Sequence, residues 1–148
     1  MTRAHSLAKQ KRTAQRFDEA MQFQRAGNLQ EAERRLAKVV ASDPAHAPAL
    51  HCLALLAHRR GAQDEARNLM LRAAQGHDAD ATVFNNLANM LRESGRGDEA
   101  IAVYRQALAH DPENLNAQFN MARTLLERGQ GAAAQSAFEH VLRAAPDD

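Results

Sequence analysis

Residues 95–122 read GRGDEAIAVYRQALAHDPENLNAQFNMA, and much of this pattern can be read again from Gly61 and from Gly129. The chain has only seven glycines, and four of them share one constant spacing: Gly27, Gly61, Gly95 and Gly129. A catalytic domain has no need of such a spacing, whereas a stack of similar structural units does. The period therefore predicts four units of one repeated structure.

Other positions repeat in register with these glycines. Small residues form two columns, Ala20, Ala54, Ala88 and Ala122 before the glycines and Ala32, Ala66, Ala100 and Ala134 after them. A column of large side chains accompanies them: Leu36, Met70, Tyr104 and Phe138. A proline closes three of the units, and Asp78 takes its place in the second. Paired small residues let two backbones approach closely, so we predict that all three columns lie in the core.

Each unit is predicted to be two α-helices, because apolar residues recur at steps of three and four and no stretch alternates as a half-buried strand would. The predicted helices cover residues 13–26, 29–42, 47–60, 63–76, 81–94, 97–109, 115–128 and 131–145. Each glycine falls where the first helix of a unit ends, a position that needs a left-handed backbone conformation. The predicted fold class is therefore all-α.

The period of the repeat, with its small, aromatic and proline positions, resembles that of the tetratricopeptide repeat (TPR) family. The resemblance implies a right-handed α-solenoid of four helix-turn-helix units at residues 13–46, 47–80, 81–114 and 115–148, after a basic extension at residues 1–12. Arg16 and Gln118 depart from the family pattern, which has a large apolar residue there. The third unit, with FNNLANMLRESGRGDEAIAVYRQAL, is similar to the repeats that precede the catalytic region of O-linked N-acetylglucosamine transferases.

Charge and composition argue against two classes of partner. The formal net charge is +1, so the whole protein gives no reason to expect nucleic acid or membrane binding. Only residues 1–16 carry charge of a single sign. They contain no acidic residue and several cationic ones: Arg3, Lys9, Lys11, Arg12 and Arg16. They could contact phosphate or anionic lipid, but no aromatic residue is interleaved, and we favour a solvated extension of the first helix. The absence of a long apolar run and the excess of Arg over Lys favour a cytoplasmic, bacterial protein.

No pattern in the sequence indicates catalytic chemistry. His51 and His58 share a helix face, but they lack the spacing and the carboxylate of a zinc site, so no metal is expected. Cys52 adjoins His51, yet neighbours on a helix point about 100° apart, which disfavours a nucleophilic pair. GxSxG, Walker and GxGxxG motifs are absent. We therefore predict a non-enzymatic protein without a cofactor, whose other helix-end histidines, such as His46 and His77, are solvated.

The resemblance implies where a protein or extended-peptide partner binds, namely the side of each first helix that faces away from the second. The residues expected there include Asn85, Asn86, Asn89, Arg92, Asn120, Arg123, His51 and His58. Asparagine side chains can hydrogen-bond a peptide backbone without reading its sequence, and the arginines favour an acidic side chain or a terminal carboxylate. Asn86 and Asn120 match peptide-contacting asparagines of the transferase repeats. The carboxylate clamp of chaperone-binding repeats is incomplete, because Phe17 and Met21 replace its lysines.

Two questions stay open at the level of sequence. The chain is either a binding module in itself or the substrate-docking region of a larger enzyme, of a glycosyltransferase or sulfotransferase kind, and the coding region after Asp148 would separate these readings. The last helix is expected to expose parts of Phe138, Val141 and Leu142, because terminal repeats need a polar outer face. That helix either mediates weak self-association or exposes too small a patch to do so.

Overall fold

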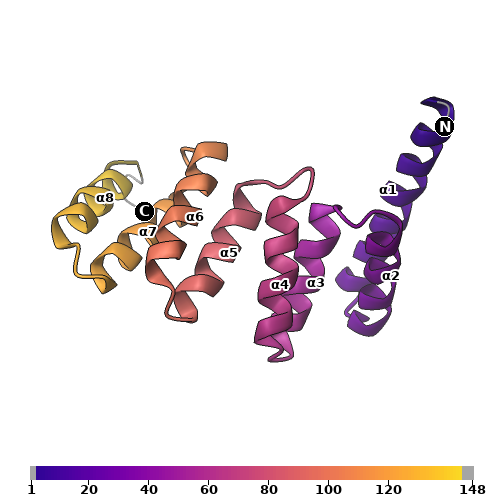
Figure 1. The fold of residues 1–148 in the computed structure, drawn as a ribbon, viewed down its shortest axis with the longest axis horizontal. Coiled ribbons are helices and arrows are strands. Elements are labelled where there is room, and N and C mark those ends of the chain that lie inside the picture. The colour runs from indigo at the N-terminus through magenta and orange to yellow at the C-terminus, as the bar shows by residue number, and fades with distance from the viewer. Residues whose placement is uncertain (1–2, 145–148) are drawn as a thin grey trace. The chain divides into compact units, whose positions relative to one another are not determined.

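The structure, a computed structural model, describes residues 3–144, and within them the chain forms eight α-helices (Figure 1). The helices are α1 (Arg3–Arg25), α2 (Leu29–Ser42), α3 (Ala47–Arg59), α4 (Gln63–Gln75), α5 (Ala81–Glu93), α6 (Gly97–His110), α7 (Leu115–Glu127) and α8 (Gly131–Ala144). The chain divides into two compact units between Asp78 and Ala79. The first contains α1 to α4 and the second α5 to α8, and no described residue belongs to a strand.

The predicted all-α fold is confirmed, and seven of the helices begin where the sequence indicates. The exception is α1, which begins at Arg3 instead of residue 13, because its polar residues continue the helix towards the N-terminus. Residues 4–12 are exposed along this extra stretch. The predicted last residue of α8, residue 145, lies outside the described part of the chain. No helix in the described residues has the length and apolar character needed to cross a membrane.

The four periodic glycines end the first helix of each pair in the predicted conformation. Their φ angles are 79° at Gly27, 83° at Gly61, 76° at Gly95 and 75° at Gly129. At the end of α5, the N–H of Arg96 donates to the carbonyl of Leu91 at 2.9 Å, which satisfies a carbonyl that the helix itself leaves unpaired. A positive φ is readily adopted by glycine alone, so this geometry explains why the spacing of the glycines is constant.

Replacing Gly95 by Val is expected to lower the free energy of unfolding by about 1–2 kcal/mol, because a β-branched residue resists a positive φ. Nothing lies within 4 Å of a Cβ added at Gly95, so the loss would come from the backbone and not from a steric clash. Gly131 offers a matched control, since it is helical, has open space around it and should accept Ala with a small gain. Urea unfolding measures both changes. Equal stability of the Gly95 variant and the unchanged protein would contradict this account of the turn.

The core of the first unit lies between α1, α2 and α3. Its buried members come from all three helices: Ala20, Leu36, Val39, Ala49, Cys52, Leu53 and Leu56. Phe17 and Met21 pack against this cluster from α1. The alanines of both predicted columns, Ala20, Ala54, Ala32 and Ala66, have no exposed surface, which confirms their predicted place in the core.

The core of the second unit is organised around Tyr104 and the small columns. Tyr104 is the largest fully buried side chain of the described residues, and Ala88, Ala100 and Ala122 are also fully buried. Ile101, Leu125 and Ala134 form a second cluster, against which Phe138 packs. Gln118 is only 7% exposed, so an amide does occupy the place where the repeat pattern has a large apolar side chain.

Two histidines at helix ends make specific contacts: His77 is exposed, as the sequence predicts, whereas His46 is half-buried. His46 caps α3, since its Nδ1 accepts the N–H of Ala49 at 3.1 Å, and burial lowers the pKa of this imidazole. His77 donates through Nδ1 to Asp78 at 3.1 Å and through Nε2 to Asp43 at 2.9 Å. These hydrogen bonds to Asp78 and Asp43 raise the pKa of His77. His77 therefore ties together the loops after α2 and α4.

Candidate functional site

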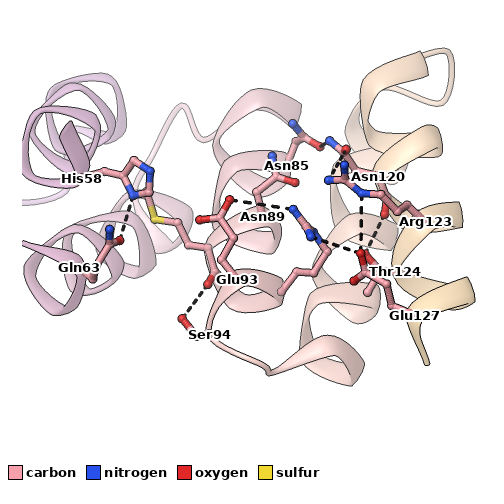
Figure 2. A network of polar contacts seen from close by, with 12 residues as sticks. His58, Gln63, Asn85, Asn89, Glu93, Ser94, Asn120, Arg123, Thr124 and Glu127 are labelled. Carbon is pink, nitrogen blue, oxygen red and sulfur yellow. Dashed lines mark hydrogen bonds and ion pairs between the residues drawn. The ribbon is translucent and has the colours of Figure 1, made fainter. Parts of the chain in front are cut away.

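Helices α5 and α7 of the second unit bring amide side chains together. Asn85 and Asn120 are almost one repeat apart, and Nδ2 of Asn120 donates to Oδ1 of Asn85 at 3.4 Å (Figure 2). Nη2 of Arg123 donates to Oδ1 of Asn120 at 3.4 Å. We call Asn85, Asn120, Arg123, Arg92 and Glu127 the amide–guanidinium cluster. It unites four of the predicted site residues in one network across two helices.

The guanidinium groups of the cluster share a single acidic side chain from α7. Nη1 of Arg92 lies 3.4 Å from Oε1 of Glu127, and Nε of Arg123 lies 4.0 Å from the same oxygen. The Nε atoms of both arginines are buried and have no hydrogen-bond partner among the described residues. Arg92 also lies near Glu93, at 3.9 Å, too far for a good hydrogen bond. Arg92 therefore lies within ion-pair distance of two carboxylates, Glu93 and Glu127, whereas Arg123 has only the long contact to Glu127.

Asn89 is engaged with the core of the second unit. Its Oδ1 accepts a hydrogen bond from the hydroxyl of Tyr104 at 2.5 Å. Burial raises the pKa of Tyr104, so the hydroxyl remains a donor at neutral pH. The oxygen of Asn89 is thus committed to the fold, and its Nδ2 is the atom left to meet a ligand. Asn86, the neighbouring predicted residue on α5, is half-buried.

The two predicted histidines belong to the first unit. His51 and His58 are both half-buried on α3. The ring Nδ1 of His58 lies 3.0 Å from Oε1 of Gln63, the first residue of α4. Between them in the sequence lies Cys52, whose burial raises the pKa of the thiol to about 11, so this sulfur is protonated at neutral pH. A protonated, buried thiol is a poor nucleophile and a poor metal ligand.

Sequence reasoning missed two members of this network. Glu127 is one helical turn after Arg123, a spacing at which opposite charges pair, and that signal is present in the sequence. Thr124 is fully buried and donates from its hydroxyl to the backbone carbonyl of Asn120 at 2.7 Å, which fixes the helix at the centre of the cluster. Within residues 3–144, no group of three or more His, Cys, Asp or Glu side chains is placed to hold a metal ion.

The repeated helix pairs and their glycine turns place this chain in a family. Two family models, both described as tetratricopeptide repeat, match residues 17–82 and residues 91–148. The chain therefore belongs to the TPR family, as the sequence pattern indicates. Comparison with curated proteins gives no match.

Solved structures share the fold. "Crystal structure of MamA" matches with a TM-score of 0.78 and 19% identity over 89% of this chain and 77% of the other. "YrrB: a TPR protein with an unusual peptide-binding site" matches with a TM-score of 0.79 and 18% identity over 88% of this chain and 68% of that one. An O-GlcNAc transferase mutant from Thermobaculum terrenum has a TM-score of 0.67 and 27% identity, over 84% of this chain but 23% of the transferase.

Proposed function

We propose that this protein is a non-catalytic interaction module that binds an extended peptide segment of a partner protein. The observation that carries the proposal is the amide–guanidinium cluster, in which side chains with both donors and acceptors are held by two adjacent first helices. In the second unit, the proposed peptide-binding residues are the predicted ones: Asn85, Asn86, Asn89, Arg92, Asn120 and Arg123. His51 and His58 of the first unit are proposed as peptide contacts of that unit by itself. YrrB, which has the same fold, is a TPR protein with an unusual peptide-binding site.

The chemistry of the cluster defines the class of peptide. Amide groups donate to backbone carbonyls and accept from backbone N–H groups, so they hold an extended chain whatever its side chains. The partly exposed guanidinium groups of Arg92 and Arg123 favour a carboxylate, either an acidic side chain or the C-terminus of the partner. We therefore expect an extended, acidic peptide and not a nucleic acid.

Nuclear magnetic resonance tests the location of this site. Addition of an acidic peptide selected from a random library should shift the side-chain amide signals of Asn85, Asn86 and Asn120 and the Nε–H signals of Arg92 and Arg123. Direct contact with a ligand changes the electronic environment of these groups, whereas those on the second helices, such as Gln106, should remain unchanged. Shifts confined to α6 and α8 would overturn the proposed location.

A second candidate function is a substrate-docking segment of an enzyme. The similarity to the Thermobaculum transferase favours it, because that match covers most of this chain and less than a quarter of the larger enzyme. The two functions differ in what the peptide site serves. Under the second, the bound peptides would be modified by a catalytic domain or subunit associated with this chain, so modification of the selected peptides by the native complex, and not by the isolated chain, distinguishes it.

A further inference from the structure

A groove in the second unit lies outside the amide–guanidinium cluster. It has a volume of about 520 Å³ and a mostly apolar lining that includes Leu108 of α6, Met121 and Leu125 of α7, and Ala137 of α8. His140 and Arg143 of α8 contribute basic side chains to the same lining. This volume falls in the range of sites that hold small molecules or single side chains.

The third repeat has an aromatic pair where the fourth repeat, at this groove, has none. In the third repeat, Phe84 stacks on His110 with ring centroids 4.9 Å apart. One repeat later, the corresponding residues are Gln118 and Ala144, so the fourth repeat has no aromatic pair there. The wall from α8 is also small, because Ala137 corresponds to Val103. The groove therefore lies where the repeat would otherwise contain aromatic rings.

Gln118 lines this groove with an unsatisfied acceptor. Its Nε2 donates to the carbonyl of Pro112 at 2.6 Å, which fixes the amide, while its Oε1 is buried and has no partner among the described residues. A buried acceptor without a donor is costly, because the group has lost its hydrogen bonds to water and gained none in exchange. The oxygen itself is covered, so a ligand would reach it only after the side chains that cover it move.

We propose that this groove is a second binding site, which receives a tryptophan side chain of a protein partner with its indole N–H directed to Gln118. An indole fills an apolar groove and is only a donor, so it satisfies Oε1 and brings no unpaired acceptor of its own. A tyrosine hydroxyl would bring lone pairs into the same buried place. His140 and Arg143 fit acidic residues on either side of the tryptophan.

Residues 1–148 cannot supply the tryptophan themselves. The chain contains no Trp and one Tyr, and that tyrosine, Tyr104, is fully buried in the core. A second copy of this chain therefore cannot supply an indole or an accessible phenol. The site is also independent of the amide–guanidinium cluster, so its failure would leave the proposed function unaffected.

The test uses the chain of residues 1–148 and the peptide acetyl-Glu-Trp-Glu-amide as the probe. Because the chain has no Trp, tryptophan fluorescence reports the probe alone. We expect a saturable blue shift, and about three- to tenfold weaker binding of a matched probe with N1-methyltryptophan, since that methyl group removes one neutral hydrogen bond. Q118L should abolish the difference between the two probes while preserving the apolar lining.

A double variant provides the complementary test. Q118F/A144H restores the aromatic pair of the third repeat, so it should fill the groove and abolish binding of both probes. Circular dichroism confirms that the variants remain helical. The proposal is overturned if the two probes bind the unchanged chain equally well, if neither shows saturable binding at millimolar concentration, or if Q118F/A144H binds as the unchanged chain does.

Discussion

Replacing Tyr104 by Ala is expected to lower the free energy of unfolding by about 3–5 kcal/mol, the range for deleting a buried aromatic side chain. Tyr104 has no exposed surface, and its ring fills the space beside the small alanine columns of the second unit. Loss of the ring leaves a cavity, and loss of the hydroxyl leaves the oxygen of Asn89 without its donor. Because a domain is stable by only about 5–15 kcal/mol, this variant should lie near the limit of folding.

Tyr104→Phe separates the two contributions, since it retains the ring and removes only the hydroxyl. We expect it to cost about 0.5–1.5 kcal/mol if water reaches Asn89, and up to about 3 kcal/mol if the amide oxygen remains buried without a donor. Chemical denaturation followed by circular dichroism measures both variants. If Tyr104→Ala lowered the free energy of unfolding by less than Tyr104→Phe does, the central packing role of this side chain would be contradicted.

The features that the sequence predicts well are those that depend on local backbone chemistry. A glycine at the end of a helix indicates a positive φ because other residues resist that conformation, and Gly27, Gly61, Gly95 and Gly129 all have it. The buried alanine columns are equally predictable, since a repeated unit must bury the same face each time. The resemblance to TPR proteins therefore has a firm physical basis.

Features that depend on which side chains meet across helices are less accessible. His46 caps α3 at the repeat position where Asp80 and Asn114 cap α5 and α7, but histidine is not among the residues preferred at an N-cap, so its role is not evident from residue type. From its position on the helix, Asn89 is predicted to contact a ligand. Only the structure shows that its amide oxygen accepts a hydrogen bond from the buried Tyr104. A solvated extension of the first helix is expected before residue 13, but its first residue cannot be predicted, because a polar helical extension carries no apolar period.

Simultaneous replacement of Asn86, Asn120 and Arg123 by Ala is expected to weaken binding of an acidic peptide by about 100-fold or more. The estimate combines two neutral hydrogen bonds with one to a charged group. The fold should persist, since none of these side chains is fully buried and Ala favours helix. Added salt should reduce only the part of this loss of affinity that comes from Arg123, because the amide hydrogen bonds are uncharged.

A matched control changes the same number and kinds of side chain on the second helices. Asn68 of α4 and Arg105 and Gln106 of α6 are exposed and lie outside the proposed site. Their simultaneous replacement by Ala removes one positive charge and two amides, as the site variant does. Peptide affinity of this control should remain within about twofold of the unchanged chain, since exposed side chains away from an interface contribute little.

Isothermal titration of one acidic peptide into the unchanged chain, the site variant and the control variant tests the central claim most directly. The account predicts that the site variant loses nearly all affinity, that the control retains it, and that both keep the helical content of the unchanged chain. Full binding by the variant of Asn86, Asn120 and Arg123, with loss of binding by the variant of Asn68, Arg105 and Gln106, would contradict the assignment of the peptide site to α5 and α7.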